Sequence, residues 1–294
     1  MSEKLLLVVN PRSGKCRARS VLLDITDVFT TNGKTVTVYP TCCKEQTISY
    51  IEENAPDYSL VVVCGGDGTL NEVINGIIRC GKRVPVGYIP LGSTNDFASS
   101  VGIPSDYIRA AEKIAEGTPS PYDLGYMNGY YFTYIACTGA FAETSYLTSQ
   151  NLKNALGHSA YLISSIKSLS TLRKTGMTIT AGDTRITGDY LFAAFTNSKN
   201  IGGVINFSQN DIKFDDGLFE LLLIKMPKDL IDFSALIRDL LNADLRNRNI
   251  DLRKLSCCEI RTDRKIGWSI DGEEGGVSDS VNIEVHPKAI DIII

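Results

Sequence analysis

Histidine is scarce in this sequence, and so are long apolar runs and excess charge. The 294 residues include 2 histidines, and the formal net charge is −4 with a sequence pI near 5.4. So few histidines make a Ser-His-Asp or Cys-His nucleophilic site implausible. An acidic chain lacks the concentrated basic surface that a general nucleic-acid binder needs. No stretch reaches the roughly eighteen uninterrupted apolar residues of a membrane-spanning helix, so we expect a soluble protein.

Cysteine is present, but not in the spacing of a metal site. The sequence has 8 cysteines, and two pairs are adjacent, Cys42-Cys43 and Cys257-Cys258, rather than spaced as Cys-x-x-Cys. Adjacent cysteines are poorly placed to chelate one tetrahedral metal, so we expect reduced thiols in a cytoplasmic protein. The apolar run at residues 5–9 is too short for the core of a secretory signal.

The most informative stretch is a short apolar run that breaks into glycines. Residues 60–64 are apolar and mostly β-branched, Gly65, Gly66 and Gly68 follow, and apolar residues return at helical spacing from Leu70. In this arrangement a strand leads through a loop without bulky side chains into a helix N-terminus, so backbone N–H groups can approach a phosphate. A plain tight turn is the alternative. The spacing matches neither Gly-x-Gly-x-x-Gly nor the phosphate loop that ends in Gly-Lys-Ser/Thr.

Strand and helix patterns alternate from residue 5 to residue 116. The expected strands are 5–9, 35–39, 60–64 and 85–89, and the expected helices are 16–31, 45–54, 70–80 and 107–116. Four consecutive βα units predict an α/β domain with an open, parallel, doubly wound sheet, which binds ligands outside the carboxyl ends of its strands. The polar, glycine-rich loops 10–15, 65–69 and 90–96 all fall at such ends.

After Pro121 the pattern changes to short strands separated by turns, which predicts an antiparallel β-sandwich as a second domain. The expected strands are 122–127, 130–136, 177–181, 185–195, 218–224, 257–261 and 266–270, with helical insertions at 150–173 and 228–243. The apolar stretch 281–294 is expected to pack back onto the first domain. The predicted domains are therefore a nucleotide-binding domain of residues 1–125 and 281–294, and a β-rich domain of residues 126–280.

Several acidic residues lie where packing does not require them. They are Asp96, Asp123, Glu143, Asp271 and Glu273. Each alone is more typical of a turn or a helix cap. Together with the glycine loops and the cationic Arg12 and Lys15, they supply what γ-phosphoryl transfer needs. Such a site requires groups that bind phosphates, carboxylates that hold Mg²⁺, and one carboxylate that accepts a proton.

With these motifs the sequence resembles the bacterial diacylglycerol kinase and lipid kinase family, which is related to the catalytic domains of sphingosine and ceramide kinases. The matching segments are Asn-Pro-Arg-Ser-Gly at 10–14, Gly-Gly-Asp-Gly-Thr-Leu-Asn-Glu at 65–72, residues 90–98 and Asp-Gly-Glu at 271–273. The resemblance covers nearly the whole chain. It implies ATP-dependent phosphorylation of a lipid hydroxyl by a nucleotide domain similar in fold to NAD kinases and phosphofructokinases, with a β-sandwich domain for the lipid substrate.

The resemblance also implies roles for individual residues. Glu273, with Asp271 beside it, matches the general base. Segment 213–218 is similar to a structural Mg²⁺ loop, whose ligands would be Asp216 and the carbonyls of Lys213 and Leu218, although the same turn is equally typical of a plain hairpin. The residues that would contact ATP or join its Mg²⁺-linked carboxylates are Asn10, Pro11, Arg12, Ser13, Gly14, Thr41, Gly65, Gly66, Asp67, Gly68, Thr69, Leu70, Asn71, Glu72, Ser93, Thr94, Asp96 and Asp123.

The expected acceptor is diacylglycerol, whose phosphorylation gives phosphatidic acid. Other lipid alcohols remain alternative acceptors. Two alternatives remain: an NAD kinase, which shares the Gly-Gly-Asp-Gly-Thr loop, and a catalytically silent lipid- or nucleotide-binding protein. A lipid kinase would contact the inner face of the membrane as a peripheral protein. We expect no nucleic-acid partner, and the sequence does not decide between a monomer and a homodimer. Lys153, Lys167, Arg173 and Lys174 could form a docking surface, with an ordinary solvated helix as the alternative.

Overall fold

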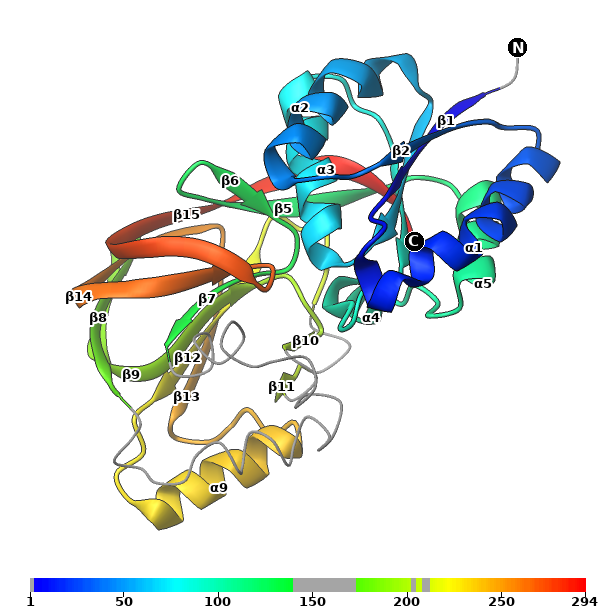
Figure 1. Ribbon diagram of the computed structural model, residues 1–294. Coiled ribbons are helices and arrows are strands. Elements are labelled where there is room, and N and C mark those ends of the chain that lie inside the picture. Colours follow the sequence, from blue (N-terminus) through cyan, green and yellow to red (C-terminus); the bar gives the residue numbers. More distant parts are fainter. Residues whose placement is uncertain (1–2, 140–172, 202–204, 208–211) are drawn as a thin grey trace. The chain divides into compact units, whose positions relative to one another are not determined.

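The computed structural model describes residues 3–139, 173–201, 205–207 and 212–294, which fall into two compact units (Figure 1). Unit 1 contains Met1–Leu124 and Pro287–Ile294, and unit 2 contains Gly125–His286. The C-terminal return to unit 1 therefore starts at Pro287 rather than at residue 281. Glu143 and, apart from Arg173, the helix expected at 150–173 lie outside the described residues.

Unit 1 is built on a parallel sheet. Its strands are β1 (Lys4–Val9), β2 (Thr35–Pro40), β3 (Leu60–Gly65), β4 (Val86–Pro90) and the end of β15 (Glu273–Ile293). Their order is β2-β1-β3-β4-β15, and all neighbours are parallel. Apart from the first residue of β1, every residue of β1 and β3 is buried, as expected for strands that helices cover on both faces.

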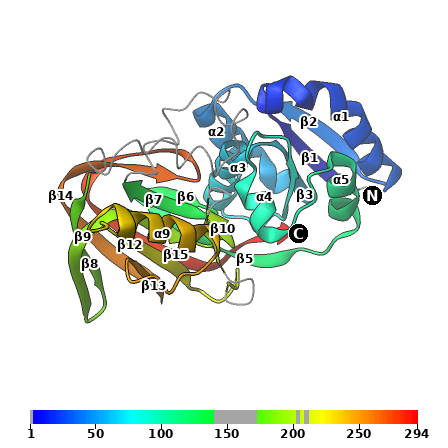
Figure 2. The same cartoon turned by 90° about the horizontal axis from the view of Figure 1, so that it is seen from below.

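Helices cover both faces of this sheet. They are α1 (Ser13–Thr31), α2 (Lys44–Asn54), the 3-10 turn η1 (Ala55–Asp57), α3 (Asp67–Cys80), α4 (Asp96–Val101) and α5 (Tyr107–Glu116). α1 packs with α5 on one face, and α2 packs with α3 on the other (Figure 2). In α3 the buried Leu70, Val73, Ile74 and Ile77 recur at helical spacing, and the left-handed Gly81 ends the helix. The unit has the doubly wound arrangement predicted from the sequence.

The direction of strand addition reverses between β1 and β3. From β1 the chain moves to β2 on one side, and after β2 it returns to β3 on the other side of β1. The loops after β1 and β3 therefore lead to opposite faces of the sheet. Open α/β sheets bind their ligands at such a topological switch point, which here lies between segments 10–14 and 65–67.

Unit 2 consists mainly of antiparallel strands. It contains the end of β5 (Ser120–Met127), β6 (Tyr130–Phe132), β7 (Ile135–Gly139), β8 (Thr175–Ala181), β9 (Thr184–Thr196), the hairpin of β10 (Asn200–Ile201) and β11 (Ile205–Asn206), β12 (Phe219–Lys225), α9 (Leu230–Leu241), β13 (Ile250–Leu255), β14 (Cys257–Ile270) and most of β15. Its core includes Met177, Phe195, Leu221, Trp268 and Ile283. No helix within the described residues combines the length and apolar character needed to cross a bilayer.

The sandwich predicted for this unit is not confirmed as two separate sheets. β9 has 13 residues and β14 has 14. The first part of β9 pairs with β8 and its second part with β7, while β14 pairs with β8 near its start and with β7 at its end. Pairing thus follows a closed circuit, β8-β9-β7-β14-β8. Because the two long strands belong to both halves of the circuit, the strands form one connected sheet around the core.

Replacing Gly76 of α3 with alanine tests the close packing of α2 on α3. A Cβ there would lie 2.6 Å from the Cβ of Ile51 and 2.9 Å from the carbonyl oxygen of Ile48. We expect Gly76→Ala to destabilise the protein by about 1–3 kcal/mol in urea unfolding, because overpacking outweighs alanine's better helix propensity. Gly267→Ala is the control, since nothing lies within 4 Å of its Cβ. Equal stability of the two variants would contradict the packing.

Candidate active site

Asn10 joins the loop after β1 to the loop after β3. Its backbone N–H donates to the carbonyl of Cys64 at 2.9 Å, and its side-chain Nδ2 donates to Thr69 Oγ1 at 3.0 Å. Its Oδ1 accepts the N–H of Arg12 at 3.0 Å, which turns the chain toward α1. Thr69 is buried in the first turn of α3. One amide side chain therefore fixes both loops of the switch point.

Glycines let three loops approach one another through their backbones. A Cβ on Gly14, whose φ is +53°, would lie 2.1 Å from the carbonyl oxygen of Leu91. A Cβ on Gly92 would lie 2.6 Å from the Cα of Gly66. The N–H of Leu91 donates to the carbonyl of Gly65 at 2.8 Å. The loops that end β1, β3 and β4 thus form one surface with little side-chain bulk, suited to a phosphate chain.

Asp67 links this surface to α4. Its carboxylate accepts the N–H of Asp96 at 3.0 Å and the N–H of Phe97 at 3.3 Å, so it caps the first turn of that short helix. Tyr88 Oη lies 3.5 Å from Asp67 Oδ1. Burial, and then the Asp67 charge, raise the pKa of Tyr88, so its hydroxyl stays protonated and can donate. Asp67 therefore has a structural role whatever it contacts in a complex.

Asn95 is a part of this site that the sequence analysis missed. It precedes α4 with a left-handed φ of +54°, a conformation that asparagine tolerates better than most residues. Its Oδ1 accepts the N–H of Gly92 at 2.9 Å and the hydroxyl of Tyr88 at 3.2 Å, and its Nδ2 donates to the Gly92 carbonyl at 3.0 Å. An Asn before an Asp in a glycine-serine loop is the sequence signal that could have indicated this cap.

The other residues of unit 1 that are predicted to bind the nucleotide range from exposed to buried. The N–H of Thr41 donates to the carbonyl of Val9 at 2.8 Å, which places Thr41 beside the loop after β1. Arg12, Ser93 and Thr94 are exposed, whereas Leu70 and Asn71 are buried. Pro11, Ser13, Gly68, Glu72 and Asp96 are partly exposed. The buried residues thus shape the loops, while the exposed ones can reach a ligand.

Asp123 lies in β5 and is fully buried. Its Oδ1 accepts the backbone N–H of Lys288 at 2.6 Å, just after the chain re-enters unit 1 at Pro287. Lys288 has a left-handed φ of +51°. The bond of Asp123 to Lys288 helps to hold the returning C-terminal strand.

Asp271 and Glu273, the two predicted catalytic residues, have different surroundings in unit 2. Asp271 is buried, and its carboxylate accepts the N–H and hydroxyl of Thr133 at 2.7 and 2.9 Å, and the N–H groups of Tyr134 and Ile135 at 3.0 and 3.1 Å. Four donors occupy both oxygens. Glu273 is exposed at the start of β15. Asp271 is therefore suited to fix the turn, and Glu273 to exchange a proton.

Segment 213–218, the predicted Mg²⁺ loop, forms a turn that leads into β12. Asp216 Oδ1 accepts the N–H of Leu218 at 3.1 Å, and Gly217 has a left-handed φ of +75°. Lys213 and Asp216 are exposed. No group of three His, Cys, Asp or Glu side chains that could hold a metal occurs in the part of the chain that is described. One carboxylate and two carbonyls remain a donor set compatible with Mg²⁺, which keeps several of its waters.

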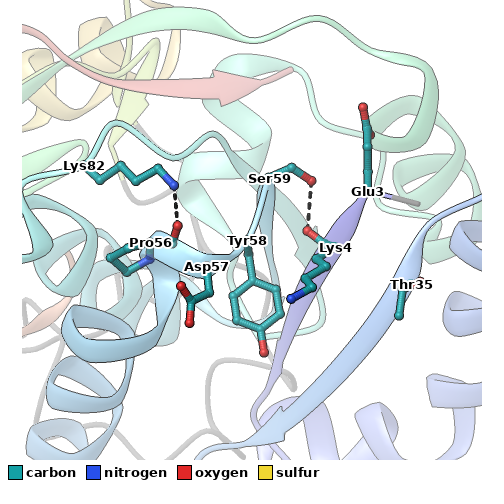
Figure 3. A pocket seen from close by; sticks show the side chains of 8 residues that line it. All are labelled: Glu3, Lys4, Thr35, Pro56, Asp57, Tyr58, Ser59 and Lys82. Carbon is teal, nitrogen blue, oxygen red and sulfur yellow. Dashed lines mark hydrogen bonds between the residues drawn. The ribbon is translucent and has the colours of Figure 1, made fainter. Parts of the chain in front are cut away.

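An open depression of about 720 Å³ lies at the opposite end of the unit 1 strands (Figure 3). It is lined by Glu3, Lys4, Thr35, Pro56, Asp57, Tyr58, Ser59 and Lys82. Within it Ser59 Oγ donates to the carbonyl of Lys4 at 2.9 Å, and Lys82 donates to the carbonyl of Pro56. These residues stand at the amino ends of the strands, so the depression is not the site formed by the glycine loops.

Replacing Asp271 with asparagine separates the two acids of unit 2. One carboxylate oxygen would become an NH₂ group, and two of the four donors would then face another donor. We expect Asp271→Asn to lower the free energy of unfolding by about 2–6 kcal/mol. Glu273→Gln, at an exposed position two residues away, should change it by less than about 0.5 kcal/mol. Urea unfolding checks both, and a wild-type stability for Asp271→Asn would contradict the structural role.

Comparisons with known proteins point to one family. The family model of the diacylglycerol kinase catalytic domain matches residues 4–127. A diacylglycerol kinase from Bacillus subtilis (strain 168) is 31% identical over 285 residues, covering 95% of this chain and 93% of the relative. One from Staphylococcus carnosus (strain TM300) is 28% identical over 290 residues, covering 97% and 94%. A crystal structure of a diacylglycerol kinase from Bacillus anthracis str. Sterne shares the fold, with a TM-score of 0.77 at 22% identity over 99% of this chain and 97% of that one. This chain belongs to the diacylglycerol kinase family and is a kinase.

Proposed function

We propose that this enzyme transfers the γ-phosphoryl group of ATP to the hydroxyl of diacylglycerol, giving phosphatidic acid. The relatives from Bacillus subtilis and Staphylococcus carnosus are named diacylglycerol kinases. The observation that carries the proposal is the meeting of three glycine loops at the switch point of unit 1. The hydrogen bonds of Asn10 to Thr69 and of Asp67 to the start of α4 hold these loops together.

The phosphates of ATP would lie on the N-terminus of α3. This helix has 14 residues, and its first turn follows Gly66, so the N–H groups that point out of its N-terminus and its dipole favour an anion there. The exposed Arg12, Ser93 and Thr94 offer a cation and two hydroxyls at the neighbouring loops. Backbone groups and these side chains would share the recognition of the phosphate chain.

Mg²⁺, when bound, would neutralise charge on the phosphate oxygens. Asp96 is partly exposed at the start of α4 and would be the carboxylate that holds it. Asp216 with the carbonyls of Lys213 and Leu218 would hold a second, structural ion in unit 2. Asp67 and Asp123 would support these groups through the backbone, as their hydrogen bonds suggest.

Glu273 would be the general base. The lipid hydroxyl oxygen forms a bond to the γ-phosphorus, the bond from that phosphorus to the bridging oxygen of ADP breaks, and the hydroxyl proton passes to the Glu273 carboxylate. Since the transition state of phosphoryl transfer is loose, proton transfer comes late and positioning dominates. Glu273 suits this role because it is exposed, while Asp271 fixes the turn on which it stands.

Diacylglycerol resides in the bilayer, so the enzyme would act as a peripheral protein at the cytoplasmic face of the membrane. Two of the basic residues considered for docking are described. Lys174 pairs with Asp189 at 2.6 Å, which reduces the charge it can offer to anionic lipid, and Arg173 is exposed. Lys153 and Lys167 lie outside the described residues, so Arg173 is the described residue that best suits this contact.

Radiolabelled ATP, Mg²⁺ and a panel of acceptors test the proposal. The panel contains diacylglycerol, phosphatidylglycerol and a polyprenol in mixed micelles, with NAD as the soluble acceptor. We expect label to appear in phosphatidic acid. Label in NAD and in no lipid would favour the NAD kinase alternative, and no transfer to any acceptor would favour a silent binding protein.

Glu273→Gln tests the base in the same assay. We expect kcat to fall by about 10²–10⁴-fold, as is usual when a general base is lost, while the affinity for ATP stays within a factor of about two. Glu274→Gln is the matched control, because Glu274 is the next residue of β15 and is also exposed. A Glu273→Gln enzyme with full activity would remove this residue from the base role.

A further inference from the structure

Thr133 is a polar residue of unit 2 to which the proposed reaction assigns no role. It lies between β6 and β7 and is fully buried. Its backbone N–H, at 2.7 Å, and its hydroxyl, at 2.9 Å, both donate to Oδ2 of Asp271. The two residues are 138 positions apart in the sequence. One threonine therefore supplies two of the donors that hold a distant carboxylate.

Asp271 and Gly272 form the turn of the hairpin between β14 and β15. The residues that flank the turn, Ile270 and Glu273, are cross-strand partners, and Asp271 and Gly272 have φ angles of +48° and +82°. A two-residue hairpin turn with positive φ at both positions has the character of a type I′ turn. Glycine adopts positive φ readily, whereas aspartate does so at a cost in energy. The turn therefore depends on the groups that hold Asp271, and Glu273 is the first residue after it.

The segment from Thr133 to Ile135 surrounds the Asp271 carboxylate. Oδ1 accepts the N–H groups of Tyr134 and Ile135 at 3.0 and 3.1 Å, and the N–H of Asp271 donates to the carbonyl of Ile135 at 2.9 Å. The carbonyl of Tyr134 accepts the hydroxyl of Thr196 at 2.6 Å, which ties this segment to β9. Among these contacts with Asp271, the Thr133 hydroxyl is the donor that a substitution can remove without changing the backbone.

We propose that Thr133 is a positioning residue for Glu273, and that its hydroxyl acts by fixing the Asp271 carboxylate and, with it, the hairpin turn. The inference rests on the proposed function, in which Glu273 accepts the proton of the lipid hydroxyl. Hydrogen bonds to a carboxylate are stronger than those between neutral groups, so the loss of one loosens the turn. A displacement of about 1 Å in an active site can lower the rate about 100-fold. Thr133 thus affects the reaction through the turn rather than through the substrate.

Thr133→Val tests the inference in the assay with radiolabelled ATP and diacylglycerol in mixed micelles. Valine keeps the shape of threonine and removes the hydroxyl. We expect kcat to fall about 10- to 100-fold, while the KM for ATP stays within a factor of about two, because the nucleotide loops of unit 1 are unchanged. Thr133→Ser keeps the hydroxyl, so its kcat should stay within a factor of about three of the wild-type value. A Thr133→Ser enzyme as slow as Thr133→Val would overturn the role of the hydroxyl.

Thr138→Val is the matched control. Thr138 is also fully buried, and its hydroxyl donates to the carbonyl of Gly267 in β14 at 2.6 Å, away from the hairpin turn. We expect both valine variants to lose stability in urea unfolding, but only Thr133→Val to lose kcat. If Thr133→Val does not fold, Thr133→Ala replaces it, since alanine removes the hydroxyl without placing a methyl group against the carboxylate. A folded Thr133 variant without the hydroxyl that is as active as Thr138→Val would overturn the inference.

The Glu273→Gln background separates positioning of the base from a general structural effect. If Thr133 acts through Glu273, adding Thr133→Val should lower the residual kcat of Glu273→Gln by less than about twofold. The same fold-loss in both backgrounds would overturn the inference, because Thr133 would then act by another route. Full activity of Glu273→Gln would overturn the proposed base and the inference with it, whereas wild-type kcat in Thr133→Val alone would leave the proposed function in place.

Discussion

The candidate site depends on the close approach of backbones at one end of the unit 1 sheet. The loops that follow β1, β3 and β4 meet where Gly14 faces Leu91 and where Gly66 faces Gly92, at separations that a side chain would not permit. The hydrogen bonds of Asn10 and Asp67 then hold the loops in that position. The strand order places this contact at the switch point, so the fold and the glycines together create a surface suited to the anion site that we propose.

The acids that the sequence analysis singled out, as far as they are described, include some that hold the backbone and some that face solvent. Asp67, Asp123 and Asp271 each accept backbone N–H groups from a segment distant in sequence. Glu273 and Asp216 are exposed. Buried carboxylates with several donors stabilise an irregular loop, because no other side chain satisfies so many N–H groups at once. The chemistry we propose therefore uses Asp96 and Glu273, which stand on segments that Asp67 and Asp271 hold through backbone N–H groups.

Local patterns predicted the parallel domain well. The continuous apolar strands and the helical spacing of Leu70 to Ile77 are properties of short segments, and the structure has elements there with nearly the same bounds. The short α4 was not expected, because its start depends on the carboxylate of Asp67, which is distant in sequence. Residues 130–136 were expected as one strand, but the chain breaks at Thr133 and Tyr134, whose N–H groups turn to Asp271.

Long-range pairing limited the prediction for unit 2. Segments 257–261 and 266–270 were read as two strands, and they are parts of one strand with an irregularity between Arg261 and Ile266. β13 was missed, since all of its residues are at least partly exposed and its charged residues conceal the alternation. In the site, the motifs indicated the loops, but no pattern in the sequence distinguishes the buried Asp271 from the exposed Glu273.

The affinity of ATP for a Gly92→Ala variant tests the central claim most directly. A Cβ at Gly92 would lie 2.6 Å from the Cα of Gly66, whereas a Cβ at Gly87 would lie 2.6 Å from Ile114, within β4 and away from its carboxyl end. The account predicts that Gly92→Ala weakens ATP binding by roughly 5- to 150-fold, since overpacking costs about 1–3 kcal/mol, while a folded Gly87→Ala keeps wild-type affinity. Unchanged ATP affinity in Gly92→Ala would contradict a phosphate site built on these loops.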